Sequence, residues 1–253
     1  MTADSDNRDS DSPLLEVRNL QSGYGDLRVV WDVSLDVYPG RVTALLGRNG
    51  AGKTSTLRAI SGLNKVHGGT ITMGGTDLSG VAPHRRVRRG MAYVQEGKRV
   101  FHKQTVEQNL LLGGYTRGKR RSALKSDVER TYEMFPILGE KRNLLAGSMS
   151  GGQQQMLAIG AALMSDSKLL MLDEPSGGLA PVIVNEVMEH VQLLKENGLA
   201  VLLVEQAVEA AMSVADHVTV LDIGKVVLDS PADQIDDMEV LKDAYFGRSD
   251  SPA

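Results

Sequence analysis

The sequence feature that most constrains the fold of this chain is a glycine-rich loop between a strand-like and a helix-like segment. Residues 47–54 read Gly-Arg-Asn-Gly-Ala-Gly-Lys-Thr, which satisfies the phosphate-loop pattern G-x-x-x-x-G-K-[ST]. Residues 41–47 form a nearly continuous apolar run, and residues 53–63 carry apolar side chains at helical spacing. A strand, a glycine-rich loop and a helix in this order predict a βα unit that binds phosphate.

The residue types of this loop suit a bound nucleotide. Glycines let the backbone curl so that successive N–H groups point at phosphate oxygens. We expect Lys53 to bridge the β- and γ-phosphates and the Thr54 hydroxyl to ligate Mg²⁺. The predicted nucleotide-binding residues of this segment are Gly47, Arg48, Asn49, Gly50, Ala51, Gly52, Lys53, Thr54 and Ser55.

A second apolar strand, residues 169–174, ends in two acids. Ligands of open α/β folds gather at the carboxyl ends of strands. We expect Asp173 to hold the Mg²⁺ shell, and Glu174 to orient and deprotonate the water that attacks the γ-phosphate. An acidic pair after a strand is by itself more often an ordinary loop start, so this prediction depends on the phosphate loop.

Apolar strands alternate with helical segments and predict an α/β fold with a parallel sheet covered on both faces. The strands at 169–174 and 199–205 are the clearest of these. The other predicted elements are antiparallel strands within 14–37, a capping box at Thr105 and Gln108, helices over 122–135 and 181–197, and a closing hairpin over 217–230.

The bulk properties exclude several classes of protein. A length of 253 residues with 42% hydrophobic residues fits one large domain with an inserted subdomain. The net charge of -4 argues against nucleic-acid binding, and the absence of cysteine excludes disulfides and thiolate metal sites. No apolar run approaches the roughly 20 residues that span a bilayer. We therefore expect a soluble protein whose membrane role comes through a partner.

A second glycine-containing segment precedes another helical pattern. Residues 148–155 read Ser-Met-Ser-Gly-Gly-Gln-Gln-Gln. Ser150 there suits either a plain helix N-cap or a second anion site at a helix N-terminus. One nucleotide does not need two phosphate cradles, but two subunits meeting head to tail would use both.

Together these motifs resemble the ABC ATPase family from about Leu14 to Gly247. The resemblance implies a P-loop NTPase (RecA-like) core with an antiparallel β subdomain and an inserted α-helical subdomain. It implies ATP and Mg²⁺ as cofactors, and a second ABC ATPase subunit paired head to tail. Tyr24 is then expected against adenine. The residues expected to contact the γ-phosphate held by the opposite subunit are Ser150, Gly151, Gly152 and Gln153.

The same resemblance implies a division of the chain. We expect a disordered acidic tail over 1–12, an ABC ATPase domain over 13–247 and a flexible tail over 248–253. Within the domain, the nucleotide-binding core with its β subdomain comprises 13–98 and 157–247, and the helical subdomain with the signature segment comprises 99–156.

Two positions depart from the usual pattern of the family. Phe101 sets a register in which the slot that commonly holds a Mg²⁺-sensing glutamine holds Glu96, while Gln95 lies one place early. Only one of the two can occupy the site, because neighbours on a strand face opposite ways. Gln206 stands where the family often has a histidine near the γ-phosphate; glutamine donates a hydrogen bond but does not titrate near neutrality. Both Glu96 and Gln206 are kept as candidate catalytic residues, and Glu96 also as a metal ligand.

These departures, with the segments at 94–101, 105–114 and 202–206, resemble the F-type ATPase subunit of branched-chain amino acid importers. The implied function is ATP hydrolysis that energises such an importer at the cytoplasmic face of the cell membrane. The implied partners are a different but related ATPase chain, permease subunits docked between the 91–112 region and the helical insert, and an extracytoplasmic solute-binding protein.

Alternative functions remain open at this point. Importers of urea and short amides share much of the pattern, and an ABC ATPase for lipid extraction or for a non-transport task is a further possibility. A stand-alone nucleotide switch would need the base-reading motif N/T-K-x-D, which the chain lacks. The basic runs at 84–89 and 117–121 fit either solvated helix faces or attraction to anionic lipid headgroups.

Overall fold

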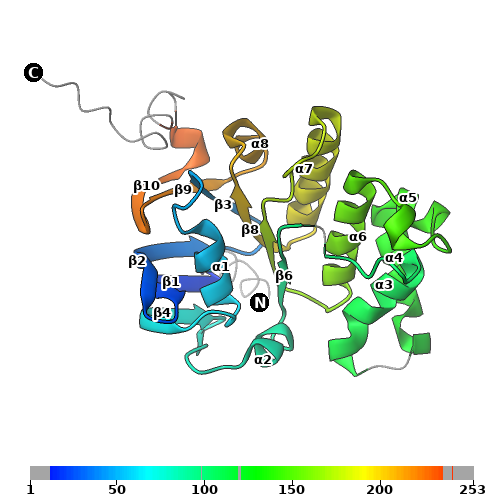
Figure 1. Cartoon of the computed structure of the whole chain (residues 1–253), viewed down its shortest axis with the longest axis horizontal. Helices are drawn as coiled ribbons and strands as arrows, with labels where there is room; N and C mark the ends of the chain where they lie inside the picture. Colours follow the sequence, from blue (N-terminus) through cyan, green and yellow to red (C-terminus); the bar gives the residue numbers. More distant parts are fainter. Residues whose placement is uncertain (1–11, 98, 119–120, 236–240, 242–253) are drawn as a thin grey trace, which may run out of the picture.

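A computed structural model describes residues 12–97, 99–118, 121–235 and 241 of the chain. Ten strands of this part form one sheet in the order β5-β4-β1-β2-β10-β9-β3-β8-β7-β6 (Figure 1). Strands β9, β3, β8, β7 and β6 run parallel to their neighbours, and β10 closes this half as the antiparallel partner of β9. The predicted α/β core with a parallel sheet is confirmed.

The strands are β1 Leu15–Tyr24, β2 Leu27–Val37, β3 Val42–Gly47, β4 Val66–Met73, β5 Thr76–Asp77, β6 Met91–Val94, β7 Leu169–Asp173, β8 Ala200–Glu205, β9 His217–Asp222 and β10 Lys225–Pro231. The α-helices are α1 Lys53–Ile60, α2 Pro83–Val87, α3 Val106–Gly113, α4 Lys125–Met134, α5 Pro136–Glu140, α6 Gly151–Leu163, α7 Pro181–Glu196 and α8 Val208–Met212. Short 3₁₀ turns occupy η1 Gly114–Arg117, η2 Arg121–Leu124, η3 Ala146–Ser148 and η4 Ala232–Gln234.

The central strands are buried on both faces, as their unbroken apolar runs predict. Every residue of β3, β7 and β8 is buried. Leu170 and Leu172 belong to the apolar cluster that includes the helical segments, whereas Leu169 and Met171 belong to a second cluster with α1 and the antiparallel strands. This alternation along one strand places two separate cores on the two faces of the sheet.

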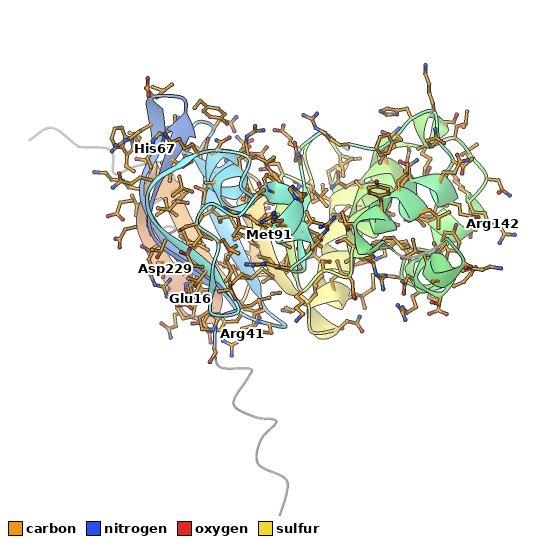
Figure 2. The ribbon with its side chains drawn as sticks, turned by 90° about the horizontal axis from the view of Figure 1, so that it is seen from below. Glu16, Arg41, His67, Met91, Arg142 and Asp229 are labelled. Carbon is orange, nitrogen blue, oxygen red and sulfur yellow. The ribbon has the colours of Figure 1, made fainter. Side chains whose placement is uncertain are left out.

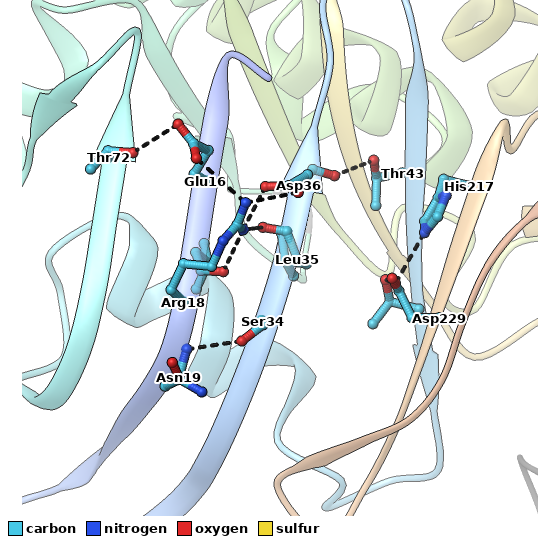
Figure 3. Close-up of polar contacts among 12 residues, drawn as sticks. Glu16, Arg18, Asn19, Ser34, Leu35, Asp36, Thr43, Thr72, His217 and Asp229 are labelled. Atoms are coloured by element: carbon cyan, nitrogen blue, oxygen red, sulfur yellow. Dashed lines mark hydrogen bonds and ion pairs between the residues drawn. The ribbon is translucent and has the colours of Figure 1, made fainter. Parts of the chain in front are cut away.

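The antiparallel strands β1, β2, β4 and β5 form the β subdomain at one end of the sheet. Polar side-chain contacts join these strands to one another, and Figure 3 shows those between β1 and β2. The guanidinium of Arg18 on β1 donates to both carboxylate oxygens of Asp36 on β2, at 2.6 and 3.0 Å. The antiparallel arrangement predicted for residues 14–37 is confirmed.

Helices α3 to α6 lie beyond β6, at the opposite end from the β subdomain (Figures 1 and 2). In Figure 2, Arg142 marks this helical end, and Glu16 and His67 mark the sheet end. Phe135 and Leu138 are fully buried between these helices. The predicted capping box is present, because Thr105 Oγ1 accepts from the Gln108 N–H and Gln108 Oε1 accepts from the Thr105 N–H.

Several predicted element ends differ in the structure, most of them by one residue, and the ends of α1, α4 and β7 are among them. Helix α1 ends at Ile60 rather than at residue 63, because Gly62 takes the left-handed conformation that terminates helices. Helix α4 starts at Lys125, after the 3₁₀ turn η2, rather than at residue 122. Strand β7 ends at Asp173, since Glu174 has a φ of 48° and leaves the strand.

Two arginines of the basic runs have structural partners instead of solvated side chains. Arg86 is buried and donates to four backbone carbonyls, among them Ala59 and Ile60 at the end of α1. Arg117 forms an ion pair with Asp127 on α4. The remaining described basic residues of 84–89 are exposed.

The expected division of the chain stays a prediction. The proposed border between residues 156 and 157 falls inside the continuous helix α6. Residues 1–11 of the predicted acidic tail, and all of the tail at 248–253, lie outside the described residues. Within the described part of the chain, every helix is too short or too polar to cross a bilayer.

Candidate functional site

The loop between β3 and α1 takes the form that its glycines allow. Gly52 is the N-cap of α1, with a φ of 106° that side-chain-bearing residues rarely adopt. A Cβ on Gly47 would lie 2.4 Å from the backbone oxygen of Leu221, so the close approach of β9 requires glycine there. The predicted order of strand, loop and helix is confirmed.

Lys53 opens helix α1 and is almost completely buried. Its Nζ donates to the backbone oxygens of Gly47 at 2.7 Å and Arg48 at 3.3 Å. The same ammonium lies 3.4 Å from Oε1 of Glu174. A buried ammonium bonded to the loop backbone places positive charge where phosphate oxygens would approach the loop.

Thr54 and Asp173 meet although they are 119 residues apart in the chain. Thr54 Oγ1 donates to Asp173 Oδ1 at 3.0 Å, and the Tyr93 hydroxyl donates to Asp173 Oδ2 at 2.7 Å. Burial raises the pKa of Asp173, while both hydrogen bonds act in the opposite direction. Burial also raises the pKa of Tyr93 well above its usual value, so this hydroxyl stays protonated and remains a donor.

Lys53 and Thr54 border a cavity of about 770 Å³. It lies at the carboxyl ends of β3, β7 and β8, the edge at which open α/β sheets bind ligands. The lining residues are Tyr24, Val29, Arg48, Asn49, Gly50, Gly52, Lys53, Thr54, Ser55, Glu96, Gly97, Gln155, Glu174, Gly177, Gly178 and Gln206.

Most of the sequence-predicted residues therefore share one cavity, including Glu96, Glu174 and Gln206 from three different loops. Gln95 is not among the described residues that line it, so Glu96 is the one of this pair that faces the site. Asp173 reaches the site through its bond to Thr54. Gly47 and Ala51 shape the loop from behind: Ala51 is buried, and its backbone oxygen accepts from the Gly224 N–H.

Tyr24 stands at the outer edge of this cavity, at the end of β1. Its side chain is about half exposed, and its hydroxyl lies 3.4 Å from the Ser55 hydroxyl. The guanidinium of Arg58 is 5.9 Å from the ring centroid, within the range of a cation–π contact. Residues of α1 thus contact the Tyr24 ring on one side. A ring held in this way is suited to stack against a flat base.

Residues 150–153, the core of the signature segment at 148–155, lie outside this cavity. Ser150 is the N-cap of α6 and forms a capping box with Gln153, so the plain N-cap alternative describes its role within one chain. Gln153 Oε1 also accepts from Lys141 Nζ. A Cβ on Gly152 would lie 2.3 Å from Ile183 on α7, so helix packing alone requires glycine there. The structure does not bring Ser150, Gly151, Gly152 or Gln153 together with the phosphate loop of the same chain.

Sequence reasoning missed several groups at the site, and three of them contribute side chains. Tyr93 carries no motif, and only the pairing of β6 with β7 reveals its contact with Asp173. Gln155 is buried and lines the cavity from α6. Its position in the first turns of the helix that begins after Ser150 is the one sequence signal that could have indicated this. Val29 of β2 reaches the cavity by a long-range approach that no local pattern indicates.

The donors at Thr54 and Asp173 fit a hard cation such as Mg²⁺, which prefers oxygen ligands. In the described residues no group of three or more histidine, cysteine, aspartate or glutamate side chains is placed to hold a metal. Mg²⁺ is commonly held by one or two protein ligands with substrate phosphates and water completing its shell. The site therefore suits an ion that arrives with a nucleotide.

Comparison with known proteins gives consistent results. The profile of the ABC transporter family matches residues 30–177. The chain is 40% identical to the high-affinity branched-chain amino acid transport ATP-binding protein BraG of Pseudomonas aeruginosa, over 92% of this chain and 100% of that protein. It is 33% identical to the probable branched-chain amino acid transport ATP-binding protein LivF of Archaeoglobus fulgidus, over 92% of this chain and 99% of that protein.

Solved structures also resemble this chain. A nucleotide-free ATP-binding cassette from an ABC transporter superposes with a TM-score of 0.82 at 26% identity. The match covers 92% of this chain and 96% of the cassette. The similarity thus extends beyond the phosphate loop to the helical segments and the antiparallel strands.

Proposed function

The chain belongs to the ABC transporter family and is an ATPase, and from this premise we propose that it energises an importer of branched-chain amino acids. The proposal rests on one observation above all: Lys53, Thr54 and Glu174 converge on the cavity of about 770 Å³. The similarity to BraG and LivF along nearly the whole chain supports the importer and its substrate class.

In the proposed reaction, the loop N–H groups and Lys53 bind the β- and γ-phosphates of ATP, and Tyr24 stacks on adenine. Thr54 and Asp173 would hold Mg²⁺, with Glu96 as a further candidate ligand. The bound ion would neutralise charge on the phosphate oxygens. Glu174 accepts the proton of the attacking water, and Gln206 donates a hydrogen bond near the γ-phosphate.

A second ABC ATPase subunit completes each site in this proposal. Ser150, Gly151, Gly152 and Gln153 lie outside the cavity of their own chain, yet form a glycine-containing helix N-terminus suited to an anion. Head-to-tail pairing would bring this segment to the nucleotide of a related but different chain. Each chain then contributes half of two composite sites.

Permease subunits are the proposed membrane partners. A groove of about 480 Å³ lies beside the nucleotide cavity and is lined by Glu96, Gly97, Arg99, Val100, Phe101 and His102. The Phe101 ring is exposed, and Glu96 lines both the groove and the nucleotide cavity. A permease segment seated here would touch the loop that carries Glu96. We accordingly place the chain at the cytoplasmic face of the membrane, with a solute-binding protein delivering substrate outside.

Purification from membranes together with uptake measurements tests this function. A deletion strain should lose uptake of leucine, isoleucine and valine, and the chain carrying Lys53→Ala should not restore it. The tagged chain should co-purify with a permease and with a second ATPase. Loss of urea or short-amide uptake instead would shift the substrate class. Normal uptake of all these solutes, with the chain bound to a lipid-extraction complex or to no membrane protein, would overturn the importer.

A further inference from the structure

A buried carboxylate outside the predicted catalytic set lies at the end of strand β8. Glu205 is 1% exposed. Its Oε1 accepts from the Ser176 N–H at 2.9 Å, and its Oε2 accepts from the Ser176 hydroxyl at 2.7 Å. The Gln206 N–H also donates to Oε2, at 3.3 Å. Both oxygens of one carboxylate thus bind the backbone and side chain of a loop 29 residues away.

Glu205 has no cationic partner among the ion pairs of the described residues. Burial of an unpaired carboxylate is costly, and burial does raise the pKa of Glu205 although its hydrogen bonds act to lower it. The preceding residues of β8 are apolar and completely buried. An apolar side chain would continue that core without a desolvation cost, but it would leave the Ser176 N–H and hydroxyl without the acceptors that hold them.

The two segments joined by Glu205 both belong to the nucleotide cavity. Ser176 lies two residues after Glu174 and directly before Gly177 and Gly178, which line the cavity. Gln206, the next residue after Glu205, lines the same cavity. One side chain therefore fixes the distance between the loop after Glu174 and the residue proposed to face the γ-phosphate.

The conformation of Glu174 makes such a restraint necessary. Its φ of 48° is unusual for a residue with a side chain, and such a strained conformation persists only where neighbouring contacts hold it. The Glu174 N–H donates to Val204 of β8, and the Gly177 N–H donates to Glu174. The bonds from Ser176 to Glu205 complete the attachment of this turn to β8.

We propose that Glu205 is a positioning residue for ATP hydrolysis: it clamps the loop at 176–180 to the end of β8, so that Glu174 and Gln206 face the same nucleotide. Glu205 does not line the cavity itself and acts through Ser176 and Gln206. The inference rests on the roles proposed above for Glu174 and Gln206.

The test uses full-length chain in its assembled transporter, with the variants Glu205→Gln, Ser176→Ala and the double variant. Glu205→Gln keeps the size of the side chain but replaces one acceptor oxygen by a donor group. Each single variant should lower kcat by about ten- to a hundred-fold, since misplacement of a reacting group by about 1 Å has effects of this size. The KM for ATP and the affinity for a non-hydrolysable ATP analogue should change less than two-fold.

Two comparisons separate positioning from mere stability. Asp36→Asn changes another carboxylate, which accepts from the Arg18 guanidinium on β1 and is not among the residues that line the cavity; it should lower the melting temperature without lowering kcat. The double variant should lose no more kcat than the stronger single variant, because both changes break the same clamp.

Different results would contradict the proposed role of Glu205 and the proposed function of the chain. Wild-type protein that neither binds nor hydrolyses ATP would contradict the proposed function. Active wild type, with kcat unchanged in both Glu205→Gln and Ser176→Ala, would overturn the clamp alone. Losses of kcat that multiply in the double variant, or that match a loss of folded protein, would overturn it as well. Should Glu205→Gln fail to fold, the kcat and KM of Ser176→Ala decide.

Discussion

At the scale of single residues, the site depends on hydrogen bonds that fix each oxygen before any ligand is considered. Asp173 is held by Thr54 on one oxygen and by Tyr93 on the other. Glu174 faces the Lys53 ammonium at 3.4 Å. The two adjacent acids therefore have different polar neighbours, hydroxyls around Asp173 and an ammonium beside Glu174.

Glu174→Gln should leave ATP binding intact while removing most of the turnover. The amide keeps the shape of the side chain but cannot accept a proton, and loss of a general base costs about a hundred- to ten-thousand-fold. Steady-state hydrolysis by the assembled transporter and binding of labelled ATP measure the two effects. Unchanged hydrolysis would remove Glu174 from the role of base.

Tyr93→Phe should raise the Mg²⁺ concentration that hydrolysis requires, without affecting ATP binding in the absence of the ion. The change deletes only the hydroxyl that bonds Asp173 Oδ2, and loss of a group that orients a metal ligand typically costs about ten- to a hundred-fold in metal affinity. Titration of hydrolysis with Mg²⁺ gives the half-saturating concentration. Tyr132→Phe is the matched control, because its buried hydroxyl has no hydrogen-bond partner among the described residues; an equal shift in both variants would contradict the prediction.

At the scale of elements, the sheet holds these residues by joining strands that are distant in the chain. Strand β3 lies between β8 and β9, so the phosphate loop emerges beside Gln206 and against the β9–β10 turn. The Gly224 N–H of this turn donates to Ala51 in the loop. The hairpin predicted at 217–230 thus supports the phosphate loop from behind.

The hairpin carries a polar pair whose contribution to stability should depend on pH. His217 Nε2 lies 3.0 Å from Asp229 Oδ1 (Figure 3). This hydrogen bond, with one from Thr219, holds the pKa of Asp229 below its usual value. A lowered carboxylate pKa stabilises the fold above the unfolded pKa of about 4, and this contribution is lost as pH falls through the folded pKa.

Asp229→Asn should therefore unfold at a lower temperature than wild type near neutral pH, and the difference should shrink as pH falls below about 4. Thermal unfolding followed by circular dichroism across this pH range measures it. A difference that stays constant or grows on acidification would show that the ionised carboxylate of Asp229 does not stabilise the hairpin.

At the scale of the whole molecule, one chain carries two candidate anion sites that its own fold keeps apart. The nucleotide cavity is built on the sheet, whereas the signature segment heads α6 at the junction with the helical end. Gly152 packs on Ile183 of α7, which fixes α6 against the core. A rigid separation of this kind requires a second subunit if both sites are to act on one nucleotide.

Ser150→Ala should lower hydrolysis by the ATPase pair while leaving ATP binding by this chain unchanged. The comparison is Thr105→Ala, which removes the same kind of capping box from α3; each should cost about 1 kcal/mol of stability. Only Ser150→Ala should also reduce turnover, measured per assembled pair. Equal turnover in the two variants would leave Ser150 with the role of a helix cap alone.

The sequence by itself determined the features that depend on neighbouring residues. The phosphate loop, both capping boxes and the closing hairpin follow from local backbone preferences, and the apolar runs of β7 and β8 follow from burial on two faces. Only the tertiary structure decided which distant groups meet. Tyr93 with Asp173, Ser176 with Glu205, and Glu96 rather than Gln95 in the cavity depend on strand order and on the direction of each side chain. No local pattern encodes such contacts, because each joins segments that pair only after the sheet has formed.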